Sequence, residues 1–216
     1  MDKFTLQNKA LIVIAKRNSG KSILIKYLVQ DAIKHNEFNK IFVISSTNSI
    51  NFFYNDIIPA NCIFDKYSED WVNKLIDLMS EKNKGRTIQS DGVYNVLLIL
   101  DDMASDVLFH TSNSIKKLYS RGRHSFISII CVGQMLHHVS PLMRNNSDWV
   151  ITGQLNASNI DLLCDEYRVP IIEKREFIKL YKKSTTAYNF FVINNNSVLT
   201  DDDKINSYYG TIKAKI

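Results

Sequence analysis

The sequence predicts an α/β fold of three layers, in which helices cover both faces of a mainly parallel sheet. Apolar, β-branched runs at 10–14, 94–100 and 126–132 are continuous rather than alternating, which is typical of parallel strands buried on both faces. Amphipathic segments with helical spacing, such as 21–36, separate these runs. A chain of 216 residues suffices for one such domain and is short for two, so we expect a single domain over residues 1–216.

Composition narrows the class of protein. Hydrophobic residues make up 45% of the chain and charged residues 23%, as in ordinary globular proteins. No apolar run approaches the roughly 20 residues that span a bilayer, and the first residues lack a signal-peptide pattern, so we expect an intracellular protein without a membrane span. Three cysteines without C-x-x-C spacing argue against a disulfide framework and a zinc site. The net charge of +5 permits a polyanionic partner without identifying one.

The remaining elements follow from apolar spacing and capping residues. A helix is expected after Ser68, its N-cap, with an apolar face of Trp71, Leu75, Leu78 and Met79. Further strands are expected at 40–46, 63–64 and 149–152, and a closing hairpin at 188–193 and 197–199. Further helices are expected at 111–119, after Ser140-Pro141, and at 156–167 and 171–182.

The segment 12–22 has the order of strand, polar turn and helix in which phosphate-binding loops occur. The strand is followed by a turn that closes with Gly20-Lys21-Ser22, and apolar residues then recur at helical spacing. Backbone N–H groups at a helix N-terminus are unpaired, and the helix dipole adds positive charge there. We therefore expect Lys21 to reach the β- and γ-phosphates of ATP and the Ser22 hydroxyl to bind Mg²⁺.

Ala15 stands where the usual pattern, G-x-x-x-x-G-K-[ST], has its first glycine. A methyl group is compatible with that position if φ is negative, and Gly20, which lets the backbone approach the phosphates, is present. The alternative is a turn that only caps an ordinary helix, but the preceding strand and the amphipathic helix favour nucleotide binding. The residues expected to contact the nucleotide are Ala15, Lys16, Arg17, Asn18, Ser19, Gly20, Lys21 and Ser22.

Two carboxylates follow the strand at 94–100. Asp101 is expected to hold Mg²⁺ through water, because this ion keeps much of its hydration shell. Asp102 is expected to orient and polarise the attacking water. A strand that ends in an Asx-turn is common by itself, but the combination with the phosphate-binding loop favours a site that hydrolyses a nucleoside triphosphate.

The strand at 126–132 leads into Gly133-Gln134. Where an NTPase has an extra strand between the loop strand and the acidic strand, a polar residue at its end senses the γ-phosphate, and Gln134 fits this role. We therefore expect this strand to separate the other two, in a three-layer P-loop NTPase fold of the RecA/ASCE-like type. Direct pairing of the loop strand with the Asp101 strand would favour a kinase instead.

Four motifs, in this order, resemble the FtsK/HerA superfamily of DNA-pumping ATPases. They are Lys16-Arg17-Asn18-Ser19-Gly20-Lys21-Ser22, Leu98-Ile99-Leu100-Asp101-Asp102, Arg121-Gly122-Arg123-His124 and Gly133-Gln134. The chain is most similar to the small genome-packaging ATPases of large DNA viruses and virophages, in the poxvirus-type branch, which often has Asp in place of a catalytic Glu. The resemblance covers about residues 9–155.

The resemblance implies a ring of five or six subunits in which an arginine of one subunit completes the ATP site of the next. Such a residue stabilises charge on the transferred phosphoryl group and raises the rate by about 10³ to 10⁵ in studied cases. Arg121 and Arg123 are the candidates, with Arg144 as the second choice. The implied partners are double-stranded DNA and capsid protein at a vertex, and the implied location is the host cytoplasm, the viral factory or the virion.

Basic residues near the polar loop 81–91 are candidates for contacts with DNA phosphates. They are Lys82, Lys84, Arg86, Lys116 and Lys117. Two other functions remain open at this stage. A nucleoside or nucleotide kinase also uses a phosphate-binding loop, and basic residues between 168 and 183 would suit its lid. A nucleotide-switched assembly protein would bind ATP and hydrolyse little of it.

Overall fold

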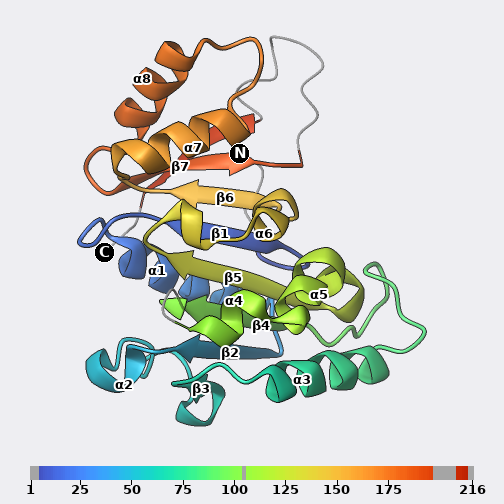
Figure 1. Ribbon diagram of the computed structural model, residues 1–216. Helices are drawn as coiled ribbons and strands as arrows, with labels where there is room; N and C mark the ends of the chain where they lie inside the picture. Colours follow the sequence, from blue (N-terminus) through green and yellow to red (C-terminus); the bar gives the residue numbers. More distant parts are fainter. Residues whose placement is uncertain (1–4, 104–105, 197–207, 214–216) are drawn as a thin grey trace.

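The computed structural model describes residues 5–103, 106–196 and 208–213. Its strands form one eight-stranded sheet in the order β3-β2-β4-β5-β1-β6-β7-β8 (Figure 1). The strands are β1 (Ala10–Ile14), β2 (Lys40–Ser45), β3 (Ile63–Phe64), β4 (Val96–Asp101), β5 (Ile127–Gly133), β6 (Trp149–Thr152), β7 (Asn189–Asn194) and β8 (Tyr209–Lys213). Strands β1 to β6 pair in parallel, whereas β7 and β8 are antiparallel to their neighbours, so the predicted mainly parallel sheet is confirmed.

Helices cover both faces of this sheet. The α-helices are α1 (Lys21–Lys34), α2 (Asn48–Asn51), α3 (Glu69–Lys82), α4 (Val107–Thr111), α5 (Asn113–Arg121), α6 (Pro141–Asn145), α7 (Ala157–Tyr167) and α8 (Lys174–Ser184), and the 3-10 turns are η1 (Ala60–Cys62), η3 (Gly122–Ser125) and η4 (Leu136–His138). Leu11 and Val13 of β1 pack with the apolar face of α1. Ile12 and Ile14 share the opposite core with α3, α5, α7 and α8. Alternate residues of β1 are thus buried on both sides, as its continuous apolar run predicts.

The order of three central strands positions the site. Strand β5 lies between β4 and β1, as expected for the extra strand of a hydrolase. In the register, Ile14 of β1 pairs with Gly133, and Asp101 of β4 pairs with Val132. The carboxyl ends of all three strands therefore meet at one edge of the sheet.

Two sequence expectations require correction. Leu78 does not belong to the apolar face of α3: it is 59% exposed, whereas Val72, Leu75 and Met79 are buried. At about 100° per residue, Leu78 lies roughly a quarter turn from the centre of that buried stripe. The strand expected at 197–199 lies outside the described residues, and the strand that pairs with β7 is instead β8. None of the helices in the described ranges is long and apolar enough to cross a membrane.

Candidate nucleotide-binding and catalytic site

The phosphate-binding loop joins β1 to α1 and is fixed to both neighbouring strands. The Ala15 N–H donates to the Gly133 carbonyl (3.2 Å), and the Lys16 N–H donates to the Gln154 carbonyl (2.9 Å). Gly20 is the N-cap of α1 with φ +87°, a conformation that glycine adopts without strain, and it offers no side-chain cap. The first N–H groups of α1 are consequently left for an anion, as a phosphate site requires.

The structure explains how Ala15 replaces the usual glycine. A methyl group placed on Gly153, just after β6, would lie 2.7 Å from Cβ of Ala15 and 2.9 Å from Cε1 of Phe190. The missing side chain of Gly153 therefore makes room for the methyl group of Ala15. Ala15 is not among the described residues with a positive φ. Its methyl group is therefore compatible with the backbone at this position, as the expectation from the sequence required.

Lys21 begins α1 and folds back over the loop. Its Nζ donates to the carbonyls of Ala15 (2.5 Å) and Lys16 (3.0 Å). Burial lowers the pKa of Lys21, and the carboxylates of Asp101 and Asp102 oppose this shift. The ammonium group is thus attracted electrostatically by both carboxylates, and it lies at the loop where phosphates would bind.

Asp101 is the last residue of β4 and is held by a residue that the sequence did not single out. Tyr54, itself buried, donates its hydroxyl to Oδ2 of Asp101 (2.9 Å). Burial raises the pKa of Asp101 to about 6, the negative charge of Asp102 adds to the shift, and the Tyr54 hydrogen bond and Lys21 oppose it. Tyr54 lies in an aromatic and asparagine-rich stretch between α2 and η1, where no local pattern predicts its partner.

Asp102 leaves the strand in a left-handed conformation, with φ +56°. Its N–H donates to the Val132 carbonyl (3.2 Å), and its carbonyl accepts from Oγ of Ser46 (2.9 Å). Nε2 of Gln134 donates to Oδ1 of Asp102 (3.4 Å), and Nε of Arg17 donates to Oε1 of Gln134 (3.3 Å). The predicted water-orienting acid, the predicted γ-phosphate sensor and an arginine of the loop therefore form one chain of hydrogen bonds.

These groups surround one cavity of about 260 Å³. Its lining comprises Arg17, Asn18, Lys21, Ser22, Thr47, Asn51, Phe53, Asp101, Asp102, Val132, Gly133 and Gln134. Ser22 and Asp101 supply a hydroxyl and a carboxylate, oxygen donors that suit Mg²⁺, an ion that usually retains several waters. Thr47, Asn51 and Phe53 come from the segment around α2 and were not predicted as site residues.

The two candidate arginines lie at the opposite edge of the sheet. Arg121 ends α5 and Arg123 lies in η3, which precedes the amino end of β5, whereas Gln134 follows its carboxyl end. NH2 of Arg123 is 3.4 Å from Oδ1 of Asp148, whose side chain is fully buried. Neither arginine lines the cavity of its own chain. A role in the site of a neighbouring subunit therefore stays a proposal.

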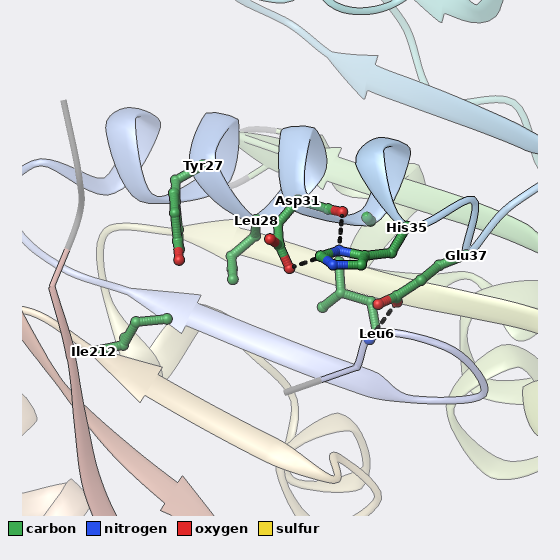
Figure 2. A pocket seen from close by; sticks show the side chains of 8 residues that line it. Leu6, Tyr27, Leu28, Asp31, His35, Glu37 and Ile212 are labelled. Carbon is green, nitrogen blue, oxygen red and sulfur yellow. Dashed lines mark hydrogen bonds and ion pairs between the residues drawn. The ribbon is translucent and has the colours of Figure 1, made fainter. Parts of the chain in front are cut away.

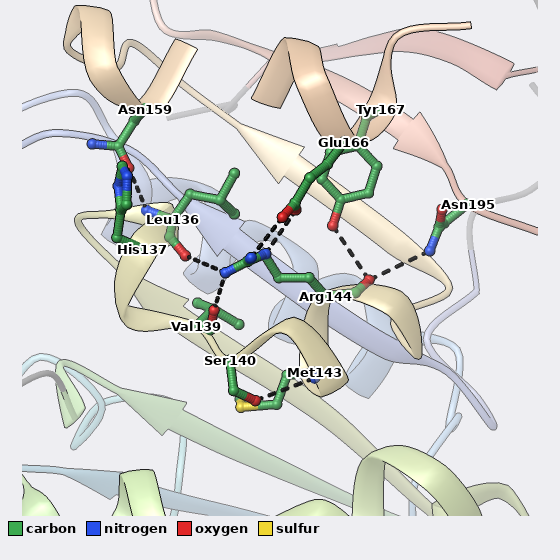
Figure 3. Close-up of polar contacts among 10 residues, drawn as sticks. All are labelled: Leu136, His137, Val139, Ser140, Met143, Arg144, Asn159, Glu166, Tyr167 and Asn195. Atoms are coloured by element: carbon green, nitrogen blue, oxygen red, sulfur yellow. Dashed lines mark hydrogen bonds and ion pairs between the residues drawn. The ribbon is translucent and has the colours of Figure 1, made fainter. Parts of the chain in front are cut away.

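Arg144, the second-choice arginine, is engaged within its own chain (Figure 3). Its Nε and NH2 donate to the two carboxylate oxygens of Glu166 on α7 (2.7 and 2.5 Å), and NH1 donates to the Val139 carbonyl. Only 8% of its side chain is exposed. The pair holds the segment after Gln134 against α7, so the structure does not support Arg144 as a residue that reaches a second subunit.

Two of the candidate DNA-contacting residues also have contacts within the chain. Nζ of Lys82 lies 3.6 Å from the centre of the Tyr94 ring, and Arg86 donates to the Gly92 carbonyl. Lys84, Lys116 and Lys117 are exposed. Lys82 and Arg86 are exposed as well, so all five side chains are accessible to a partner.

A second cavity, of about 210 Å³, lies along α1 away from the loop (Figure 2). His35 is within 2.8 Å of the Asp31 carbonyl, and Glu37 accepts the Leu6 N–H at 2.9 Å. Tyr27 and Ile212 also line this cavity. None of the residues predicted for nucleotide binding or hydrolysis lines this second cavity.

The fold and this site define a P-loop NTPase: a phosphate-binding loop before α1, two acids at the carboxyl end of β4 and a glutamine after β5. Residues 2–212 match the poxvirus A32 protein family, and the chain therefore belongs to that family. The poxvirus-type family that the sequence motifs resemble is thereby confirmed.

Relatives and solved structures agree with this assignment. The chain is 31% identical over 195 residues to uncharacterized protein 075L of invertebrate iridescent virus 6 (89% of this chain, 73% of that protein). It is 28% identical over 200 residues to uncharacterized protein 088R of invertebrate iridescent virus 3 (89% and 71%). The genome packaging NTPase B204 of Sulfolobus turreted icosahedral virus 2, solved with AMP, has the same fold, with a TM-score of 0.67 at 17% identity over 99% of this chain and all of that one. The ATPase domains of EssC from Geobacillus thermodenitrificans match with a TM-score of 0.57 at 15% identity, over 88% of this chain and 38% of that one.

Proposed function

We propose that this protein is an ATP-hydrolysing motor that translocates double-stranded DNA and packages a viral genome into its capsid. The observation that carries the proposal is the hydrogen-bonded chain of Arg17, Gln134 and Asp102 beside the phosphate-binding loop. This chain connects the group that orients water to groups that face the terminal phosphate. The fold shared with a viral genome packaging NTPase supports the proposal.

Each residue has a defined part in the reaction. The N–H groups at the start of α1 and the Lys21 ammonium bind the β- and γ-phosphates, after Lys21 exchanges its loop carbonyls for phosphate oxygens. Asp102 orients a water for attack on the γ-phosphorus as the bond to the β–γ bridging oxygen breaks, which yields ADP and phosphate. Gln134 links the terminal phosphate to Asp102. Ser22, and Asp101 through water, would hold Mg²⁺, which would supply positive charge to the phosphate oxygens.

The strand order and the contacts of Asp102 favour this function over the two alternatives. A kinase was expected to pair the loop strand directly with the acidic strand, but β5 lies between them. A structural switch needs no group to activate water, whereas Asp102 is held by three contacts at the cavity. We further propose that the motor is a ring of five or six subunits. It would act with capsid protein at a vertex, in the host cytoplasm or viral factory.

Phosphate release with and without duplex DNA tests the proposal. A motor should release phosphate from ATP without an acceptor substrate, and duplex DNA should stimulate that release. Lys21→Ala should reduce turnover to background, because it removes the cation that faces the transferred phosphoryl group. Arg175→Ala, a change at an exposed residue of α8, is the control for general loss of activity. Turnover that requires a nucleoside acceptor would favour a kinase, and ATP binding without turnover would favour a switch.

A further inference from the structure

Tyr188 places an aromatic ring against the phosphate-binding loop. It directly precedes β7, and 57% of the residue is exposed. A methyl group placed on Gly20 would lie 2.9 Å from Cδ1 of this ring and 3.7 Å from Cε1. The ring therefore packs on the loop at the glycine that lets the backbone approach the phosphates, although the two residues are far apart in the sequence.

The backbone before β7 adopts an unusual conformation that presents this ring. Ala187 and Tyr188 have φ values of +53° and +61°, in the left-handed region that large side chains seldom occupy. The turn is closed by Asn189, whose N–H and Nδ2 both donate to the Thr186 carbonyl (3.0 and 2.7 Å). Phe190, two residues later, is fully buried. The turn thus keeps Tyr188 out of the core and at the surface beside the loop.

The position of Tyr188 relative to the catalytic groups indicates which part of ATP it meets. Asp102 and Gln134, which face the γ-phosphate, follow β4 and β5 on one side of β1. Tyr188 precedes β7, which lies on the other side of β1, beyond β6. Triphosphate and nucleoside are opposite ends of ATP, so a molecule with its γ-phosphate at Asp102 directs its nucleoside away from β4 and β5.

We propose that Tyr188 stacks on the base of the bound nucleotide, an inference that rests on the proposed function of the site. Every base has a π-face, so stacking binds bases with little regard to their hydrogen-bonding edges. The larger purine rings stack over a larger area than pyrimidines. The protein should therefore bind ATP and GTP with similar affinity and bind CTP and UTP more weakly.

Binding of ATP and of inorganic tripolyphosphate to the Tyr188→Ala variant tests the stacking role. Tripolyphosphate occupies the phosphate loop but has no base. Loss of a base–aromatic stack should weaken ATP binding by about tenfold and leave tripolyphosphate binding unchanged. Tyr188→Phe keeps the ring and should bind ATP as the wild type does. Phe52→Ala is the matched control, because Phe52 is also an exposed aromatic residue with a positive φ, but its ring is not among the atoms nearest to Gly20.

A fluorescence measurement gives an independent readout. In Tyr188→Trp, ATP should quench the emission of the new indole, and tripolyphosphate should not; the wild type, with its two native tryptophans, supplies the background. Equal weakening of ATP and tripolyphosphate in Tyr188→Ala would overturn the stacking role, because the ring would then only support the loop. Unchanged ATP binding in that variant would overturn it as well. If the wild-type protein bound neither compound, the proposed function itself would fail, which is a distinguishable result.

Discussion

Asp102 occupies a backbone conformation that explains why an aspartate, rather than a longer acid, suits this position. At φ +56°, short polar side chains such as Asp and Asn are enriched several-fold over other residues with a side chain. Glutamate has no comparable preference for this conformation, and its carboxylate would lie one methylene further from the backbone. The left-handed backbone conformation thus favours aspartate over glutamate and sets the position from which the side chain extends.

Asp102→Asn should therefore preserve the fold and ATP binding while it removes hydrolysis. Asparagine tolerates the same φ and retains an oxygen for Gln134, but its neutral amide polarises water poorly. Calorimetric titration with ATP and a phosphate-release assay on the same preparation would measure both effects. If Asp102→Asn lost ATP binding and Asp101→Asn lost only turnover, the roles assigned to the two acids would be reversed.

Asp101 makes the protein without ligand less stable above pH 6. Its pKa is raised from 3.8 to about 6 in the folded state, so the folded chain binds more protons than the unfolded chain between these values. Its contribution to stability consequently falls as the pH rises from about 4 to 6, and the cost persists at higher pH.

Asp101→Asn should accordingly raise the melting temperature at pH 7.5 in the absence of Mg²⁺ and nucleotide. A gain of about 3 °C is expected for each kcal/mol that the substitution recovers. Tyr54 can still donate to the amide oxygen, so the local hydrogen bond survives. The difference from the wild type should shrink as the pH approaches 4, and thermal melts across this range measure it. Asp77→Asn, at an exposed residue of α3, should show no such trend. A gain that is independent of pH would contradict the argument.

At the scale of elements, β6 and β7 shape the phosphate-binding loop through the contact between Ala15 and Gly153. The loop follows β1, and β6 is its neighbour in the sheet. Phe190 of β7 borders the same space. The unusual residue of the loop is thus matched by a glycine more than a hundred residues later.

Gly153→Ala should destabilise the protein by about 2 kcal/mol, because the added methyl group overpacks the space between Ala15 and Phe190. Ala15→Gly removes the nearer of these contacts, so the double variant should be more stable than the sum of the single effects predicts. Urea unfolding of the wild type, the two single variants and the double variant gives the coupling free energy. Strict additivity would show that the two residues do not share this space.

At the scale of the whole molecule, the two edges of the sheet separate the phosphate site from Arg121 and Arg123. An arginine at the amino end of β5 cannot reach a nucleotide at the carboxyl end of the same strand. Two subunits placed edge to edge in a ring could bring these groups together. Arg123 would then leave Asp148, from which its half-exposed side chain is separated by 3.4 Å.

Mixed rings test whether Arg121 or Arg123 acts in trans. Alanine at either position should leave ATP binding intact but reduce hydrolysis, because the loop of each subunit is complete while its neighbour lacks the arginine. Mixing the arginine variant with Lys21→Ala subunits should restore part of the activity. At some interfaces an intact loop then meets an intact arginine, and neither protein alone can form such a site.

The mixing experiment requires evidence that the two variants assemble together, for example by co-purification on two different tags. Arg175→Ala, at an exposed residue of α8, serves as the matched arginine control and should hydrolyse ATP as the wild type does. Demonstrated co-assembly without recovered hydrolysis would exclude the trans role of the arginine tested.

The sequence alone determined the parts of this protein that depend on neighbouring residues. The loop of 15–22, the acids at the carboxyl end of β4 and the glutamine after β5 follow from local patterns of apolar, glycine and charged residues. Continuous apolar runs predicted parallel strands, and Gln134 at the end of its strand predicted that β5 separates β1 from β4. Because chemistry on phosphates needs these residue types at fixed offsets, the motifs were visible without a structure.

Only the tertiary structure decided which distant residues complete the site. Tyr54 meets Asp101 across 47 residues, and Arg17 meets Gln134 across 117. Gly153 accommodates Ala15, Arg144 is buried against Glu166, and the ring of Tyr188 lies on Gly20. None of these contacts leaves a periodic or compositional trace, because each depends on how the sheet brings separate strands together. The pairing of β7 with β8 was likewise decided by the tertiary structure. The local pattern of β7 does not specify which strand pairs with it.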